Sequence, residues 1–203
     1  MANRVLLLDY GGVLGYDHLL VQEELLANAV GLTQAELNNR VSEKSVVGRN
    51  FRENKISEVE FWRTVSQSSA IDECSAQILT SMWMDTYSLN SSMMNYLQQL
   101  RQKIKVGILT NIDIGRSRLL EKILDIDDNL DYYFPSYIFG FSKDTAQLWE
   151  LVNEELTKDH KCFEVTYVDD RLEHVLSAEK VGWKGIIYHN LEQLKKQLDL
   201  LFE

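Results

Sequence analysis

The chain has 203 residues and a formal net charge of −10, with 21 Lys and Arg against 31 Asp and Glu. This acidic balance excludes nucleic acid as the expected partner, because proteins bind phosphate backbones through basic surfaces. The composition is typical of a soluble globular protein, and the N-terminal apolar run Val5 to Leu8 is too short for a membrane span or a signal-peptide core. The two cysteines, Cys74 and Cys162, are expected to be reduced thiols. We therefore expect a cytoplasmic protein with no nucleic-acid or membrane partner.

Short apolar runs predict the strands of a parallel sheet. The first, Val5 to Leu8, ends at Asp9, and Gly11 and Gly12 follow closely. A short apolar run bounded by glycines is typical of a buried parallel strand. The later runs are Ile104 to Leu109, Tyr137 to Phe139, Phe163 to Val168 and Gly185 to Tyr188.

Helical periodicity occupies most of the intervals between these runs. Asn90 or Ser91 can cap a helix that continues to Arg101. Further apolar repeats lie at Leu119 to Ile123, Leu148 to Leu156, Val175 to Ala178 and Leu191 to Phe202. Strands that alternate with helices predict βαβ units, and hence an α/β fold with a three-layer, Rossmann-like parallel sheet.

Residues 16–87 interrupt this alternation. Their apolar residues fall at helical spacing with no convincing strand; Thr33 and Ser57 can cap helices, and Ser57 with Glu60 forms a capping-box pattern. We predict a helical cap at residues 16–87, inserted after the first strand into a core of residues 1–15 and 88–203. A helical insertion next to a candidate catalytic Asp would act as a lid.

Polar residues follow the predicted strands at four places: Asp9, Thr110-Asn111, Lys143 and Asp169-Asp170. Taken singly, a Thr after a strand is more often a helix cap, a Lys a solvated side chain, and an Asp pair a turn. In a parallel sheet, however, all four groups emerge at the edge where open α/β sheets bind ligands. Their order favours one shared site.

In these motifs the chain resembles the haloacid dehalogenase-like (HAD) hydrolase superfamily, in the branch whose helical cap follows the first strand. The resemblance covers nearly the whole chain and includes the cap segment Asn54 to Trp62. It implies a hydrolase that removes phosphate from a small phosphorylated metabolite. Asp9 would be the nucleophile that forms an aspartyl-phosphate.

The same resemblance implies a Mg²⁺ cofactor. Asp9, the Gly11 carbonyl and Asp169 would bind the ion, with Asp170 acting through water. Around the phosphoryl group, Thr110 and Asn111 would bind its oxygens, and Lys143 would pair with both Asp9 and the phosphate.

The sequence departs from the family at Gly11, where the phosphatases usually carry an acid/base Asp. Tyr16 and Asp17 are conceivable substitutes. The departure leaves an alternative open, namely a catalytically weakened HAD-fold protein that binds a ligand or partner. The dehalogenase branch matches poorly, because Tyr10 lies one position from the nucleophile rather than two.

Two smaller sets of residues have competing interpretations. His174 stands where the fourth motif often has Asn, and we expect a helix-surface or packing residue there. In the predicted cap, Arg49 and Arg52 lie among interleaved Glu residues. They indicate either a solvated helix face or a contact that closes over an anionic substrate.

Overall fold

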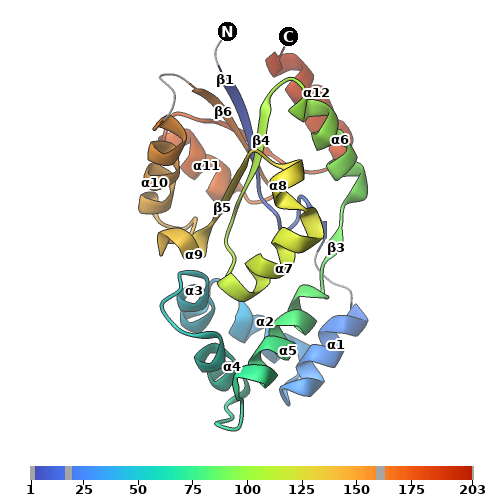
Figure 1. Ribbon diagram of the computed structural model, residues 1–203, viewed down its shortest axis with the longest axis vertical. Coiled ribbons are helices and arrows are strands. Elements are labelled where there is room, and N and C mark those ends of the chain that lie inside the picture. The colour runs from blue at the N-terminus through green and yellow to red at the C-terminus, as the bar shows by residue number, and fades with distance from the viewer. Residues whose placement is uncertain (1–2, 17–19, 159–162, 203) are drawn as a thin grey trace.

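The computed structural model describes residues 3–16, 20–158 and 163–202, and it places a parallel five-stranded sheet at the centre of the core (Figure 1). The strands lie in the order β5-β4-β1-β6-β7. Their bounds are β1 Asn3–Leu8, β4 Lys105–Thr110, β5 Tyr132–Pro135, β6 Phe163–Asp169 and β7 Lys184–Ile187.

Helices cover both faces of the sheet, and β1 shows why. Side chains alternate between the faces of a strand. Leu6 and Leu8 enter a core with α6 (Ser91–Arg101), α7 (Ile114–Leu124), the short α8 (Ile126–Asn129) and α12 (Leu191–Phe202). Val5 and Leu7 enter a second core with α10 (Ala146–Thr157) and α11 (Leu172–Lys180). The predicted three-layer α/β fold is confirmed.

One predicted strand is wrong. Tyr137 to Phe139 belongs to a short helix, α9 (Ser136–Phe139), and the strand is the preceding segment β5. Pro135 separates the two, because its fixed φ and missing N–H end the ladder. The aromatic residues that pair with β4 therefore lie before the proline, and β5 is an edge strand, where a proline is tolerated.

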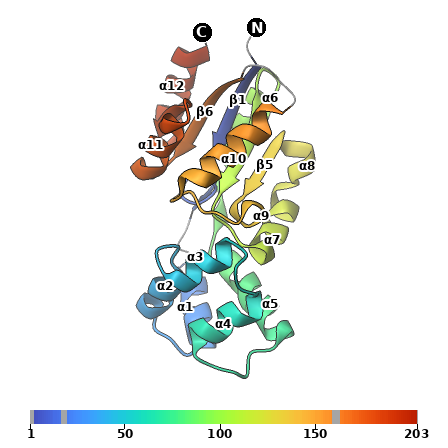
Figure 2. The same cartoon turned by 90° about the vertical axis from the view of Figure 1, so that its left-hand side faces the viewer.

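Between β1 and α6 the chain forms a separate group of helices at the carboxyl end of the sheet (Figure 2). These are α1 Leu20–Ala29, α2 Gln34–Val41, α3 Val46–Arg52, α4 Glu58–Ser66 and α5 Glu73–Met84. We refer to them as the cap. They share an apolar core in which Phe61 stacks on Phe51 and on Trp83, with ring centroids 4.2 and 5.5 Å apart.

The ends of the cap differ slightly from the sequence prediction. Tyr16 lies in a two-residue strand, β2 (Gly15–Tyr16), that pairs antiparallel with β3 (Ser88–Leu89), apart from the main sheet. The N-caps at Thr33 and Ser57 are present, but the complete capping box forms at Thr33 with Glu36. None of the described helices is both long and apolar enough to cross a membrane.

Candidate active site

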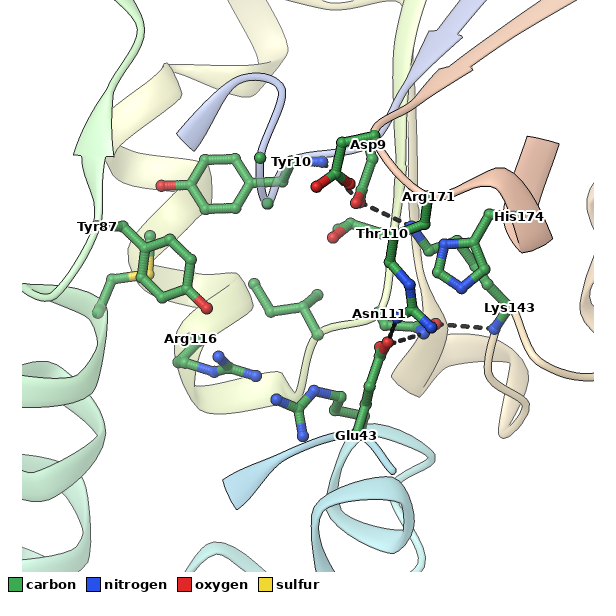
Figure 3. Close-up of a pocket in the computed structure, with 16 residues that line it drawn as sticks. Asp9, Tyr10, Glu43, Tyr87, Thr110, Asn111, Arg116, Lys143, Arg171 and His174 are labelled. Atoms are coloured by element: carbon green, nitrogen blue, oxygen red, sulfur yellow. Dashed lines mark hydrogen bonds and ion pairs between the residues drawn. The ribbon is translucent and has the colours of Figure 1, made fainter. Parts of the chain in front are cut away.

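A cavity of about 250 Å³ lies between the carboxyl ends of the strands and the cap (Figure 3). The core contributes most of its wall, and the cap contributes Glu43, Arg52 and Met84. The lining residues from the core and its connections are Asp9, Tyr10, Gly11, Gly12, Tyr87, Thr110, Asn111, Ile112, Arg116, Lys143, Asp170, Arg171 and His174. Asp169 lies directly behind this wall and is fully buried.

Lys143 joins two of the carboxylates. Its Nζ lies 2.9 Å from Oδ1 of Asp9 and 2.8 Å from Oδ2 of Asp169, and all three side chains are buried. Burial alone would lower the pKa of Lys143, but Asp169 and Asp9 together outweigh it and raise the pKa. Burial raises the pKa of Asp9 to about 6, against the attraction of Lys143. The lysine is therefore a permanent cation between two acids of different strength.

Asp169 is the more strongly held acid. Its Oδ2 accepts hydrogen bonds from Lys143, from the Tyr167 hydroxyl at 2.5 Å and from Nδ1 of His174 at 3.0 Å. The backbone N of Arg171 donates to Oδ1 at 2.9 Å. Burial opposes ionisation, yet Lys143 and His174 together hold the pKa of Asp169 well below its usual range.

Two of these partners were not expected. His174, expected at the helix surface or in packing, is buried rather than at the surface, and its Nδ1 also contacts Asp169. Tyr167 was not singled out in the sequence. Its spacing was a usable signal, because residues two apart on a strand face the same side, and Tyr167 stands two before Asp169.

Three carboxylates form a cluster that fits a divalent cation. One oxygen from each of Asp9, Asp169 and Asp170 lies within 4.8 Å of the others. Burial and the neighbouring Asp169 raise the pKa of Asp170, as expected for an acid crowded by like charge. Such a set of hard oxygen ligands suits Mg²⁺. Gly11 lines the same cavity.

Gly12 makes room for this cluster. Its φ is +73°, and a Cβ at this position would lie 2.4 Å from Oδ2 of Asp170. A side chain would therefore both strain the backbone and displace the carboxylate.

Thr110 and Asn111, at the end of β4, reach the cavity as expected. Oδ1 of Asn111 accepts a hydrogen bond of 2.9 Å from the backbone N of Lys143, and Nδ2 donates to Glu43 of the cap at 2.8 Å. Glu43 also forms an ion pair with Arg171. Neither Glu43 nor Arg171 was predicted; Glu43 lies in a turn between α2 and α3, where no periodicity marks it.

Of the two cap arginines predicted to contact a substrate, one lines the cavity and the other does not. Arg52 is buried and lines the cavity, and its Nη1 donates to the carbonyls of Val41 and Gly48. Arg49 is exposed and absent from the lining. Arg116, a core arginine that was not singled out in the sequence, also lines the cavity, and its Cζ lies 3.5 Å from the centroid of the Trp83 ring.

Of the two conceivable acid/base substitutes, only Tyr16 falls among the described residues. The Tyr16 hydroxyl accepts a hydrogen bond of 2.7 Å from Asn90, and Tyr16 does not line the cavity. Asp17 lies outside the described residues, as does Cys162; Cys74 is exposed and free. One wall is apolar: Tyr10 and Tyr87 have ring centroids 5.6 Å apart, beside Met84 and Ile112.

Solved structures share this capped α/β fold. The chain is similar to HAD family enzyme bt-2542 from Bacteroides thetaiotaomicron, solved with magnesium and inorganic phosphate, at 15% identity, a TM-score of 0.75, and coverage of 96% of this chain and 99% of that one. It is also similar to a predicted HAD-like family hydrolase from Porphyromonas gingivalis, at 18% identity and a TM-score of 0.76, with coverage of 100% of this chain and 99% of that one. A third similar structure is the L-2-haloacid dehalogenase PA0810, at 16% identity and a TM-score of 0.62, with coverage of 90% of this chain and 83% of that one.

The fold is therefore that of the HAD-like hydrolase superfamily. No protein-family model matches the chain. Among curated proteins, drimenol cyclase drtB from Aspergillus calidoustus is 25% identical over 122 residues. That stretch covers 58% of this chain and 23% of the cyclase, so the chain matches less than a quarter of the relative's length.

Proposed function

We propose that the protein is a Mg²⁺-dependent phosphatase that hydrolyses a small phosphorylated metabolite through an aspartyl-phosphate on Asp9. The observation that carries the proposal is the arrangement of Lys143 between Asp9 and Asp169, beside Asp170. A carboxylate nucleophile, a fixed cation and a carboxylate cluster for a metal are the parts that phosphoryl transfer needs.

In the first half-reaction, a carboxylate oxygen of Asp9 attacks phosphorus, and the bond from phosphorus to the leaving oxygen breaks. The Thr110 hydroxyl, at the cavity wall, binds a phosphoryl oxygen, while the Lys143 ammonium, held beside Asp9, offsets the developing negative charge electrostatically. In the second half-reaction, water attacks phosphorus and releases phosphate and the Asp9 carboxylate. Asp9, Asp169, Asp170 and the Gly11 carbonyl would hold magnesium, which would supply charge neutralisation when bound.

Gly11 bears on the substrate class. With no carboxyl at this position, the leaving oxygen must take its proton from water or depart as an anion. Acid catalysis is typically worth roughly 10²–10⁴ in rate, so alkyl phosphates suffer most and aryl or acyl phosphates least. The apolar wall of Tyr10, Tyr87 and Met84 suits an apolar leaving group. We therefore expect small phosphates with a good, partly apolar leaving group to react fastest.

The competing function is ligand or partner binding by a catalytically weakened HAD-fold protein, and Gly11 is the observation that favours it. Against it stands the complete set of Asp9, Thr110, Lys143 and Asp169, whose side chains all come together at one edge of the sheet. The carboxylate cluster of Asp9, Asp169 and Asp170 favours phosphate chemistry, in which a divalent cation offsets the charge of the phosphoryl group.

A substrate screen tests the proposal. Phosphate release is measured from aryl, acyl and alkyl phosphates, with Mg²⁺ and with a chelator, and halide release is measured from 2-haloacids. We expect Mg²⁺-dependent release that is fastest for aryl and acyl phosphates. Absence of turnover on every phosphoester, together with tight binding of one of them, would support the binding function instead.

A further inference from the structure

One oxygen of Asp169 is surrounded by donors. Lys143, Tyr167 and His174 all reach Oδ2, at 2.8, 2.5 and 3.0 Å. A carboxylate oxygen has about two lone pairs. Three donors therefore saturate Oδ2, and a metal ion cannot also approach it. Oδ1 accepts a hydrogen bond from the backbone N of Arg171, and the Asp170 carboxyl also interacts with the Asp169 carboxylate. One such donor leaves Oδ1 a lone pair that can face a cation.

Tyr167 serves Lys143 as well as Asp169. Its hydroxyl donates to Oδ2 and accepts a hydrogen bond of 3.1 Å from Nζ of Lys143. An ammonium group has three protons, and those of Lys143 go to Asp9, Asp169 and the Tyr167 oxygen. The hydroxyl thus fixes the angle at which Lys143 holds both acids.

Packing of the Tyr167 ring does not explain why this residue carries a hydroxyl group. The ring packs edge-on against Trp149, with centroids 5.0 Å apart, in the apolar core beneath the sheet. A phenylalanine would keep that contact. A buried tyrosine hydroxyl is found where its polar end has a partner, and the partners here are the two charged groups of the site.

We propose that Tyr167 is a positioning residue for the magnesium site: with Lys143 and His174 it saturates Oδ2 of Asp169, so that Asp169 presents Oδ1 alone to the cation. The inference rests on the proposed magnesium site and adds the residue that orients its buried ligand. Groups that orient a metal ligand typically contribute 10–100-fold in metal affinity or activity.

The test is Mg²⁺ affinity, measured by isothermal titration calorimetry on the full chain without substrate. Tyr167→Phe removes one hydroxyl and keeps the ring. Tyr133→Phe is the matched control, because its hydroxyl is bonded to Ser117 at 2.7 Å and Tyr133 does not line the cavity. We expect Tyr167→Phe to weaken Mg²⁺ binding on the order of 10–100-fold and Tyr133→Phe to leave it unchanged.

His174 provides a second pair of variants that does not depend on the tyrosine. His174→Gln retains a donor near Oδ2, whereas His174→Leu removes it. We expect the leucine variant to bind Mg²⁺ more weakly than the glutamine variant, at similar melting temperatures. A metal-binding readout separates positioning from packing, since loss of packing would lower the melting temperature of both variants.

Two results would overturn the inference. One is a Tyr167→Phe variant whose Mg²⁺ affinity equals that of the wild type. The other is equal weakening by Tyr167→Phe and Tyr133→Phe, which would show a general effect of losing a hydroxyl. If the wild type binds no Mg²⁺, the proposed function and the inference both fail. If the wild type binds Mg²⁺ and Tyr167→Phe binds it equally well, only the inference fails.

Discussion

The Glu43 carboxylate, in the cap, accepts a hydrogen bond of 2.8 Å from the Asn111 amide, in the core (Figure 3). Asn111 in turn accepts from the backbone N of Lys143, and Glu43 also pairs with Arg171, whose backbone N donates to Asp169. One cap side chain is thus connected to the loops that hold the buried lysine and the buried acid. We therefore expect closure of the cap and the geometry of the site to be coupled through Glu43.

Removing this connection should loosen the closed cap. Glu43→Ala is expected to raise KM by a factor of roughly 3–10 and to change kcat less, because partly buried charged hydrogen bonds contribute about 1 kcal/mol. Steady-state kinetics and a spin-label distance between cap and core measure the two effects. Glu192→Ala, which removes an exposed carboxylate paired with Lys195, is the control. An unchanged cap–core distance with unchanged KM would contradict the coupling.

Asp9→Asn is expected to abolish turnover, because an amide is a far poorer nucleophile than a carboxylate. The side chains are nearly isosteric, so circular dichroism should show an intact fold. The rate is measured on the best substrate from the screen, with Mg²⁺ at saturation. Retained activity would show that another group attacks phosphorus.

The same variant should be more stable than the wild type when the metal is removed. Burial raises the pKa of Asp9 from 3.8 to about 6, so ionisation of Asp9 costs the folded state free energy. The contribution of neutral Asp9 to the free energy of unfolding is fully present below pH 3.8, and it is lost as the pH rises through about 6. Asn cannot ionise, so its advantage should grow over that interval to on the order of 1–3 kcal/mol.

Chemical denaturation in a chelator at pH 4, 6 and 8 measures this difference. Added Mg²⁺ should reverse the order at pH 8, since the cation stabilises only the form that retains its carboxylate ligand. An advantage of Asn that shrinks as the pH rises would mean that Asp9 is stabilised, rather than destabilised, by its surroundings.

Gly11→Asp should raise the rate on alkyl phosphates more than on aryl phosphates, by supplying the missing proton donor. The gain should fall within the roughly 10²–10⁴ range of acid catalysis. Gly11 is not among the residues with positive φ, so a side chain is compatible with its backbone. Gly12→Asp is the contrasting variant and should lose Mg²⁺ binding, because its Cβ would collide with Asp170. A uniform gain across leaving groups would exclude a proton-donor role.

Strand-end residues were predictable because their position follows from chain direction alone. Asp9, Thr110 and Asp169 each come directly at or after a short apolar run, and parallel strands bring such residues to one edge. Lys143 was placed correctly even though its preceding strand was not, since its side chain reaches the site from the loop after α9.

The contacts that depend on tertiary packing were not predictable in this way. Glu43 reaches Asn111 across 68 positions of sequence, and no local pattern determines the orientation of a cap turn. Arg49 and Arg52 are the same residue type in the same helix, α3. The helix nevertheless directs Arg49 to solvent and Arg52 into the cavity. The orientation of the cap on the core decides these contacts, and it depends on the whole interface.

Gly15 pairs with Leu89 and Tyr16 with Ser88, so the chain enters and leaves the cap region through one short antiparallel ribbon. Both crossings between core and cap lie side by side in this ribbon, at the spacing of neighbouring strands. A two-residue hairpin turn is enough to join such strands, so the segment between Tyr16 and Ser88 can be replaced by one without moving either end. We therefore expect that a core joined by such a turn, or fitted with the cap of another protein, keeps the connections of the sheet and its acids.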